Sequence, residues 1–557
     1  MHWRTCLIIL YVVCASESNE DLEWLEIKIA QGSVRGRRDP SEDMFVFYNV
    51  PYATAPTKEK KFKAPLPPPK WTEPYDAINK GIICPQFLIK PLFPGNIHMQ
   101  EDCLVANIYV PNTKKNNLSV YVYVHGGGFR IGSGDWLTAK NLMKTKDIIV
   151  VNFNYRLGIH GFLCLGTEDI PGNAGMKDQV ALLRWVQQNI AAFGGNPDDV
   201  TIGGGSAGSV SVDLLMLSKA AERLFHKVIP ESGANIAEFA IQPNPLATAK
   251  HHAKRLNFAN VDDTNALEKF YKTLSYEALT ADGFLDIINT TFMFEPCIER
   301  KTAEEAFLTE SPLNILKRGD YKKLPMLYGF CNMEGLVCIA AFETWKEKMN
   351  EKFSDFMPAN LKFENENELQ EVSNQIKKFY FGDKVDNNNV LAYVNYFSDI
   401  FYVHSMLWAV KLHAKSGHDQ VYLYEYSFVD KDTPVVPHTK VRGAEHCAQS
   451  LAVLDGTNIT NANEGFISNE LRNMKKIVRE IWHNFIRTGN PVSNGSSLPE
   501  WPPAGLDASP YMSLGEKVEL RGVLLEERMR FWDGVYEKYY RKPIPPPKPP
   551  SKIRSEL

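Results

Sequence analysis

The feature that most constrains this chain is a glycine-rich segment at 203–208 (GGGSAG) between a short strand and a helix. The β-branched run at 200–202 (VTI) predicts the strand, and the apolar positions of 206–217 predict the helix. A serine at such a junction lies at the apex of a sharp turn, and the flanking glycines leave room that a Cβ would fill. The segment matches G-x-S-x-G in its required setting, so Ser206 is predicted to be a nucleophile.

Strands and helices alternate around this segment. Short apolar, β-branched runs predict strands at 118–125, 147–153, 324–328 and 421–428. Apolar stripes at helical spacing predict helices at 177–190 and 474–486. This order predicts an α/β fold with a largely parallel sheet covered by helices. The long polar stretches at 240–320 and 340–415 are interpreted as helical insertions that wall in the site.

A second glycine run, 125–129 (HGGGF), follows the first of these strands. When a hydroxyl attacks an ester carbonyl, the carbonyl oxygen becomes negative and needs hydrogen-bond donors already in place. Bare glycine backbone can approach that oxygen, and HGGG-type loops act in this way together with the amide after the nucleophile, here Ala207. Taken alone, the run is also compatible with a plain turn. Both motifs in this order favour acyl transfer.

A serine nucleophile needs a histidine base and a carboxylate behind it, and in this setting the chain order is serine, acid, histidine. The histidines after Ser206 are His226, His251, His252, His404, His413, His418, His438, His446 and His483. His446 lies in a small-residue stretch after the 421–428 strand, where a base on a loop is expected. His251, His252 and His483 are predicted to be solvated residues at the surface. Glu334 follows the 324–328 strand, and other acidic residues compete with it.

The first fifteen residues predict a signal peptide, with Arg4 before a short apolar run and small residues at the expected cleavage site. The apolar run is too short to span a bilayer. Residues 16–542 are expected to form a single catalytic domain, and 543–557 a proline-rich extended tail. Passage through the secretory pathway makes four sequons candidates for glycosylation: Asn117, Asn289, Asn458 and Asn494.

Composition narrows the possible partners. The formal net charge is −4, and basic and acidic residues are mixed along the chain without a sustained basic face, so nucleic acid is not an expected partner. No spacing typical of a zinc site occurs, and no second long apolar segment predicts a membrane span. The chain without its signal peptide has seven cysteines, and an odd number requires a free thiol or an intermolecular bond.

Four further blocks resemble the type-B carboxylesterase family, which includes carboxylesterases, cholinesterases and juvenile hormone esterases. They are 101–111 (EDCL and the strand after it), 154–163 (NYRLG…GFL), 178–197 (DQ…AFGGNP) and 231–233 (ESG). The resemblance extends over nearly all of the mature chain.

The resemblance implies the α/β-hydrolase fold and specific roles for individual residues. It implies a catalytic triad of Ser206, Glu334 and His446, oxyanion donors at the amides of Gly127, Gly128 and Ala207, and a disulfide between Cys84 and Cys103. The implied activity is the hydrolysis of small-molecule carboxylic esters through an acyl-enzyme, without metal or cofactor. Two alternatives are a non-catalytic binding module and a slow enzyme that acts as a stoichiometric scavenger of esters or organophosphates.

Two positions depart from the family pattern. The residue before the nucleophile is Gly205, where the family commonly has Glu and juvenile hormone esterases have Gln. Loss of this side chain disfavours cationic choline substrates and favours lipophilic, uncharged esters. Ser209 stands where Gly is usual. The expected location is extracellular, and the ending 554–557 (RSEL), which resembles a KDEL-type signal, offers the endoplasmic reticulum lumen as the alternative.

Overall fold

The computed structural model describes residues 23–39, 42–93, 96–281, 293–456 and 467–548. The predicted signal peptide at 1–15, the sequons at Asn289 and Asn458, and the ending 554–557 lie outside these residues. Asn117 and Asn494 are described and exposed. Within the described ranges, no helix is both long enough and apolar enough to cross a bilayer.

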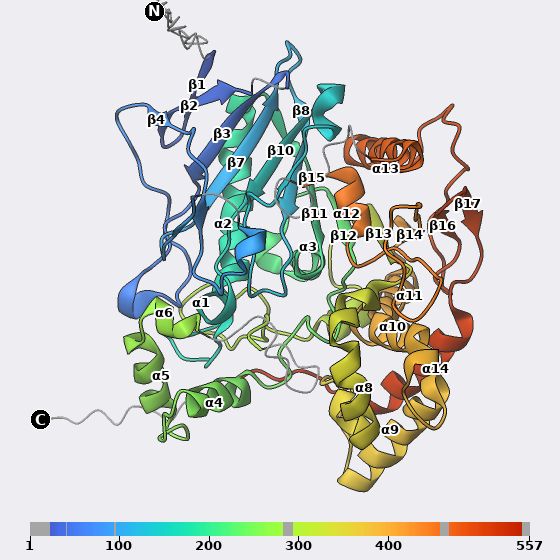
Figure 1. The fold of residues 1–557 in the computed structure, drawn as a ribbon. Coiled ribbons are helices and arrows are strands. Elements are labelled where there is room, and N and C mark those ends of the chain that lie inside the picture. Colours follow the sequence, from blue (N-terminus) through green and yellow to red (C-terminus); the bar gives the residue numbers. More distant parts are fainter. Residues whose placement is uncertain (1–22, 40–41, 94–95, 282–292, 457–466, 549–557) are drawn as a thin grey trace, which may run out of the picture.

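One large mixed sheet organises the described chain (Figure 1). Its strands, in spatial order, are β1 (Trp24–Ile29), β2 (Gly32–Arg38), β3 (Met44–Pro51), β7 (Val105–Pro111), β10 (Ile148–Phe153), β8 (Leu118–Val124), β11 (Gly195–Gly205), β12 (Lys227–Glu231), β13 (Met326–Cys331), β14 (Val421–Tyr426), β16 (Tyr511–Leu514) and β17 (Val518–Arg521). The pairs from β10 through β16 are parallel, and the pairs at both edges are antiparallel. The predicted, largely parallel sheet is therefore confirmed.

The sheet is buried on both faces, as a parallel sheet requires. Along β8, Val120 and Val122 belong to one apolar core, whereas Tyr121 and Tyr123 belong to the other. The first core includes side chains of α2 (Ala174–Asn189) and α3 (Ala207–Leu217), and the second includes side chains of α12 (Ala448–Val453) and α13 (Asn469–Thr488). Because successive residues of a strand point to opposite faces, this alternation places helices on either side of the strands.

The two predicted insertions are largely helical, and they occupy the lower left and lower right of Figure 1. The first contains α4 (Pro245–Arg255), α5 (Thr264–Thr273), α6 (Tyr276–Leu279) and α7 (Pro312–Arg318). The second contains α8 (Phe342–Glu351), α9 (Glu366–Phe381), α10 (Val390–Ser398) and α11 (His404–Lys415), which a π-helical stretch, Asp399–Val403, joins to α10. The helix α14 (Glu526–Tyr539) packs against α11. Residues 293–311 form neither helix nor strand.

Two disulfides cross-link the described part of the chain. Cys84 is joined to Cys103, the pair that the family resemblance implies, with a Cα–Cα distance of 5.0 Å. Cys164 is joined to Cys297 across 133 residues of sequence, a pairing that the sequence leaves open. Cys331, Cys338 and Cys447 are free, and of these only Cys447 is partly exposed.

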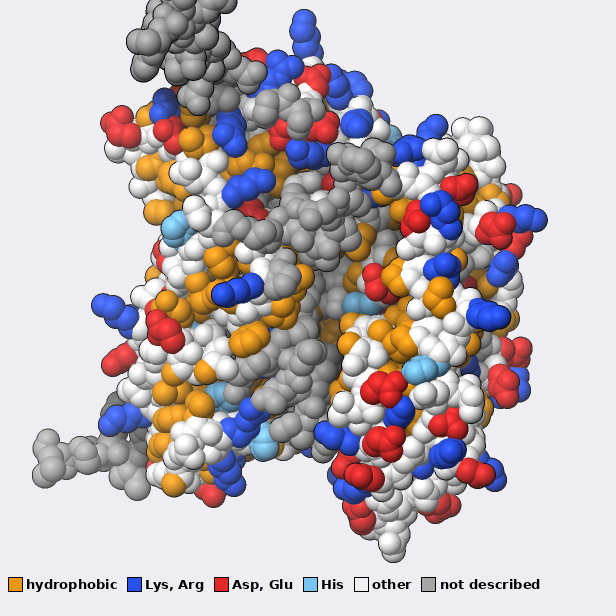
Figure 2. Space-filling view, in the orientation of Figure 1, with side chains coloured by type: hydrophobic (Ala, Val, Ile, Leu, Met, Phe, Trp, Pro, Cys, Tyr) orange, Lys and Arg blue, Asp and Glu red, His pale blue; other side chains and the backbone are white. Residues whose placement is uncertain are grey.

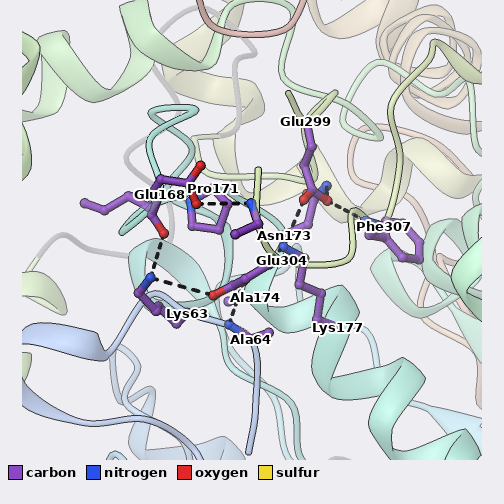
Figure 3. Close-up of polar contacts among 12 residues, drawn as sticks. Lys63, Ala64, Glu168, Pro171, Asn173, Ala174, Lys177, Glu299, Glu304 and Phe307 are labelled. Carbon is purple, nitrogen blue, oxygen red and sulfur yellow. Dashed lines mark hydrogen bonds and ion pairs between the residues drawn. The ribbon is translucent and has the colours of Figure 1, made fainter. Parts of the chain in front are cut away.

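A buried polar cluster fastens the irregular segment after 293 to the start of α2 (Figure 3). The side chain of Asn173 donates to the carbonyl of Cys297 at 2.8 Å and accepts from the N–H of the same residue at 2.8 Å. It also donates to the carboxylate of Glu299, which forms an ion pair with Lys177 at 2.9 Å. The cluster therefore fixes a segment that has no regular structure of its own.

The start of the predicted proline-rich tail, up to Lys548, has no regular structure. It does not extend freely into solvent, because Pro543 and Pro546 are buried. A Cβ placed on Gly166 would lie 3.0 Å from Pro546, so the tail passes close to the loop that contains this glycine. Most of the other described residues of the tail are exposed, so this part of it is only partly covered by the fold.

Candidate active site

Ser206 lies at the sharp turn between β11 and α3, as the motif predicts. Its φ of 58° and ψ of −123° are unusual for a residue with a side chain, and such strain persists where the surrounding structure enforces it. The N–H of Ser206 donates to the carbonyl of Glu231 at 2.8 Å. A Cβ on Gly208 would lie 2.1 Å from the carbonyl oxygen of Val124 at the end of β8, so the turn packs too tightly for any larger residue there.

Glu334 and His446 are in direct contact. His446 Nδ1 and Glu334 Oε2 are 2.5 Å apart. The other carboxylate oxygen of Glu334 accepts from the N–H of Cys331 at 2.7 Å and from the hydroxyl of Ser232 at 2.5 Å. Glu334 is fully buried, while the side chain of His446 is 14% exposed. The geometry is that of an imidazole oriented by a carboxylate, with one ring nitrogen left for another partner.

Several residues without an assigned role in the sequence support this pair. Gln449 donates to the Ser232 hydroxyl at 2.7 Å and accepts from the Cys331 thiol at 2.6 Å. The ring of Tyr402 lies against the imidazole of His446, with 4.3 Å between ring centroids. Ser232 belongs to the 231–233 block that carries the family resemblance, which is the one sequence signal that singles it out.

The loop of His446 lies beside the turn that carries Ser206. A Cβ built on Gly205 would lie 3.1 Å from the sulfur of Cys447, so the residue after His446 approaches the residue before Ser206. Among the described residues, no hydrogen bond within 3.5 Å joins the hydroxyl of Ser206 to His446. In free enzymes such a bond is often long and shortens when substrate is bound.

Seven of the other eight candidate bases have partners elsewhere, and the eighth, His251, is exposed, as expected. Three pair with carboxylates remote in sequence from Ser206: His404 with Asp533, His438 with Glu343, and His483 with Asp147. Four bond to other groups: His226 accepts from the N–H of Val200, His252 and His413 contact the hydroxyls of Tyr271 and Tyr321, and His418 contacts the carbonyl of Leu324. The expectation that His252 and His483 are solvated is wrong, since His252 is buried and His483 forms an ion pair.

Opposing effects act on the imidazole of His446. Burial lowers the pKa of His446, whereas the neighbouring Cys447 and Glu334 raise it, and the net effect is a raised pKa. Glu334 favours the protonated ring both through its negative charge and through its hydrogen bond to Nδ1. A base that must accept a proton and stabilise the resulting imidazolium requires this kind of environment.

The predicted oxyanion donors lie beside the same turn. A Cβ on Gly126 would lie 2.7 Å from the carbonyl oxygen of Gly205 and 3.1 Å from Cβ of Ser206. Gly127 has a φ of 105°, which few residues other than glycine adopt. Ala207 begins α3. Among the described residues, no hydrogen bond occupies the amides of Gly127, Gly128 or Ala207.

A buried carboxyl group lies beneath the nucleophile. Burial raises the pKa of Glu231 to about 7, although the hydrogen bond from Ser450 lowers it in part. The Ser450 hydroxyl donates to Glu231 Oε2 at 2.7 Å. Since the backbone carbonyl of Glu231 accepts from Ser206, this residue links β12 to the turn.

A cavity of about 430 Å³ borders the loop that carries His446. Most of its lining is apolar, and it includes residues on both sides of His446 in the chain: Leu336, Ile339, Val435, Ala444, Glu445, Ala448 and Leu451. The face shown in Figure 2 is hollowed near its centre, and apolar side chains gather along the hollow. Among the described residues, no group of three or more His, Cys, Asp or Glu side chains is arranged to hold a metal ion.

Comparison with known proteins agrees with this architecture. The structure superimposes on the crystal structure of juvenile hormone esterase from Manduca sexta, with OTFP covalently attached, with a TM-score of 0.82 and 29% identity over 92% of this chain and all of the other. A PNB esterase gives a TM-score of 0.70 and 26% identity over 91% of this chain and 99% of the other. The fold is therefore that of the α/β-hydrolases.

Sequence relatives agree with the structural match. A carboxylic ester hydrolase of Bombus ignitus is 30% identical over 503 residues, which cover 87% of this chain and 89% of the relative. A juvenile hormone esterase of Tribolium castaneum is 31% identical over 527 residues, which cover 88% of this chain and 86% of the relative. Residues 24–532 match the carboxylesterase family. The chain belongs to that family.

Proposed function

We propose that this protein is a serine esterase that hydrolyses carboxylic esters through an acyl-enzyme, with Ser206, Glu334 and His446 as its catalytic triad. The contact of His446 Nδ1 with the buried carboxylate of Glu334, beside the strained turn of Ser206, is the observation that carries the proposal. The family membership supports the same reaction, since the relatives named above are ester hydrolases.

In the first step, His446 accepts the proton of Ser206 as its oxygen attacks the ester carbonyl. Glu334 keeps the Nδ1 proton directed toward itself, so Nε2 is the nitrogen that accepts. The amides of Gly127, Gly128 and Ala207 donate to the negative oxygen of the tetrahedral intermediate. The alcohol leaves with the proton from His446, and water then repeats the sequence on the acyl-enzyme.

The substrates proposed are lipophilic, uncharged esters. The apolar cavity beside the His446 loop supports this choice, because apolar surface favours aliphatic or aromatic groups over charged ones. The absence of a side chain at Gly205 removes the carboxylate that the family commonly places beside the nucleophile, which argues against a cationic substrate.

Replacement of the nucleophile tests the proposal. Ser206→Ala should lower kcat for p-nitrophenyl acetate by at least about 10³-fold, because the residual rate comes from binding and oxyanion donors alone. It should also abolish covalent labelling by an organophosphate, detected by mass spectrometry. Ser209→Ala, three residues away on α3, is a matched control and should retain both properties. Turnover that survives Ser206→Ala would contradict the assignment.

Two alternative functions, a binding module and a stoichiometric scavenger, predict a different time course of product release from that of a true enzyme. A binding module would bind esters without releasing alcohol. A stoichiometric scavenger would release one equivalent of p-nitrophenol in a burst and then stop. Steady release of many equivalents, measured by stopped-flow absorbance with substrate in large excess, is the outcome expected here.

The location proposed is extracellular, with the endoplasmic reticulum lumen as the alternative. The Cys84–Cys103 and Cys164–Cys297 disulfides support an oxidising compartment. Expression of the full-length chain and of a chain without its last four residues tests the choice. Equal appearance of both in the medium supports secretion, whereas retention of the full-length chain alone supports the lumen.

A further inference from the structure

An aromatic ring covers one face of the proposed base. The ring centroids of Tyr402 and His446 are 4.3 Å apart, and the two ring planes are inclined by 31°, so the rings lie more nearly face to face than edge to face. The negative face of an aromatic ring attracts a cation whose centre lies within about 6 Å. The contact therefore favours the protonated imidazole, which is the form that His446 takes after it accepts the proton of Ser206.

The ring of Tyr402, and not its hydroxyl, is what contacts the base. Tyr402 is buried, and the ring of Phe239 packs edge-on against it with 5.6 Å between centroids. Burial raises the pKa of Tyr402, so the phenol stays neutral. Among the described residues, no hydrogen bond involves the hydroxyl of Tyr402. A phenylalanine at this position could therefore provide the same ring.

Tyr402 belongs to the π-helical stretch Asp399–Val403, which joins α10 to α11. A π-helical turn holds one residue more than an α-helical turn, and such turns are frequent at functional sites. The carboxylate of Asp399 is fully buried, forms an ion pair with Arg528 of α14 and accepts from the hydroxyl of Tyr380 of α9. Contacts from two other helices therefore fix the start of the stretch that carries the ring.

The helices on either side of this stretch contact the surroundings of the other two triad residues. The N–H of Gly335, directly after the triad acid, donates to the hydroxyl of Ser398 at the end of α10 at 2.8 Å. In α11, the sulfur of Met406 accepts from the N–H of Gly233 at 3.1 Å. A Cβ on Gly233 would lie 2.7 Å from the carbonyl oxygen of Ser206. The junction between α10 and α11 is therefore held against the acid, the base and the turn of the nucleophile.

We propose that Tyr402 is a positioning residue, whose ring holds the imidazole of His446 in place and stabilises its protonated form. The proposal rests on the proposed esterase function. Glu334 contacts Nδ1 at the edge of the imidazole, whereas Tyr402 covers a face of it. The carboxylate fixes the tautomer, and the aromatic ring limits how far the imidazole can tilt about that hydrogen bond.

Two substitutions separate the ring from the hydroxyl. Tyr402→Leu removes the aromatic face but keeps an apolar side chain. We expect its kcat for p-nitrophenyl acetate to fall about 10-fold with KM nearly unchanged, because the base is less constrained and its cation loses the ring. Tyr402→Phe keeps the ring and should retain wild-type kcat. A wild-type kcat in Tyr402→Leu, or equal losses in the two variants, would overturn the proposal.

The pH profile distinguishes this role from a general loss of packing. Only the neutral imidazole acts as a base, so the rising limb of kcat/KM follows the pKa of His446. Without the ring the cation is less stable, and Tyr402→Leu should move this limb to lower pH by on the order of half a pH unit. The substitution leaves in place the other titratable groups around the two rings, which are Glu334, Cys447, Cys338 and Glu238.

Tyr536 provides a matched control. Its buried ring lies against His404 with 4.5 Å between centroids and 33° between planes, which is nearly the geometry of the Tyr402 pair, but neither residue belongs to the proposed triad. Tyr536→Leu should lower the melting temperature to a similar degree and leave the midpoint of the kcat/KM profile at its wild-type value. An equal shift of the midpoint in both leucine variants would contradict the proposal, because lost aromatic packing alone would then explain it.

One measurement does not depend on turnover. In a Ser206→Ala background, the midpoint of the NMR titration of His446 should move to lower pH when Tyr402→Leu is added, and it should stay in place with Tyr402→Phe. An unmoved midpoint with Tyr402→Leu refutes the role of the ring even if the wild-type enzyme is active. A shifted midpoint in a protein whose wild type does not turn over esters refutes only the proposed function.

Discussion

At the scale of single residues, Glu334 is the group most dependent on its surroundings. It is fully buried, and three donors approach its two oxygens: the Ser232 hydroxyl, the Cys331 N–H and His446 Nδ1. Hydrogen bonds to a buried carboxylate are stronger than those between neutral groups, and an unmatched partner is costly. Any residue here that donates where Glu accepts must disrupt at least one of these contacts.

Glu334→Gln tests this dependence. The amide NH₂ would face a donor, so His446 would lose the acceptor that fixes its tautomer, and kcat should fall by about 10³–10⁴-fold. Thermal unfolding checks that the variant folds. The control is Glu343→Gln, because Glu343 also contacts a histidine, His438 at 2.9 Å, but is 62% exposed. That variant should keep wild-type kcat, and comparable losses in the two would argue against a special role for Glu334.

The sequence points to the residues of the proposed triad but not to those that hold them in place. Ser206 could be predicted because strand, glycines and helix are adjacent in the chain. Glu334 and His446 were two among several candidates by position alone, and the family resemblance selected them. Ser232 and Gln449 carry no local pattern for this role, because their partners lie 102 and 217 residues away in sequence. Gly205 stands out in the sequence as a departure from the family pattern. Nothing in the sequence indicates that Cys447 lies close to it in the fold.

At the scale of elements, the parallel strands were the easiest to predict. The residues of β8 and β10 are buried throughout, so they read as continuous apolar runs with clear ends. β11 is longer than the predicted 200–202, since it begins at Gly195 and has a register shift before Val200. The segment 293–311 could not be predicted, because its conformation depends on Asn173 and Glu299 rather than on any periodic pattern.

Lys177→Met tests the cluster that holds this segment (Figure 3). Lys177 is 8% exposed and Glu299 is fully buried, so the substitution leaves a buried carboxylate without its cation. The free energy of unfolding should fall by about 3 kcal/mol, measured by urea denaturation. Arg184→Met is the control, since its ion pair with Glu305 is 51% and 59% exposed and should contribute little. If the two variants lose equal stability, burial does not determine how much an ion pair contributes to the stability of this protein.

The cavity beside the His446 loop gives an element-scale prediction about substrates. Val435 lines the cavity and is 42% exposed, so Val435→Trp can narrow it with little cost to folding. We expect kcat/KM to fall for p-nitrophenyl esters of long acyl chains and to stay near wild type for the acetate. Val523→Trp, at an exposed valine outside the cavity lining, controls for added surface. A uniform effect over all chain lengths would exclude the cavity from substrate binding.

At the scale of the whole molecule, several carboxyl groups are buried away from any cation. Burial raises the pKa of Glu238 to about 8 and that of Asp213 to about 7, although hydrogen bonds lower each in part. One oxygen of Glu238 has no hydrogen-bond partner among the described residues. Each of these groups binds its proton more tightly in the folded protein than in the unfolded chain. Their effect on stability therefore depends on pH across the neutral range.

The sign of that dependence follows from proton binding. Between the unfolded value of 4.5 and the folded value of about 8, Glu238 is protonated in the native state and ionised in the unfolded chain, so unfolding releases a proton and stability falls as pH rises, by up to about 1.4 kcal/mol per pH unit. Glu238→Gln cannot ionise, so its melting temperature should decline less than that of the wild type from pH 5 to pH 8. Glu305→Gln, at an exposed carboxylate, should follow the wild-type slope. If Glu238→Gln follows it too, Glu238 is already ionised in the folded protein, and the buried environment must supply a counterion or water that stabilises its charge.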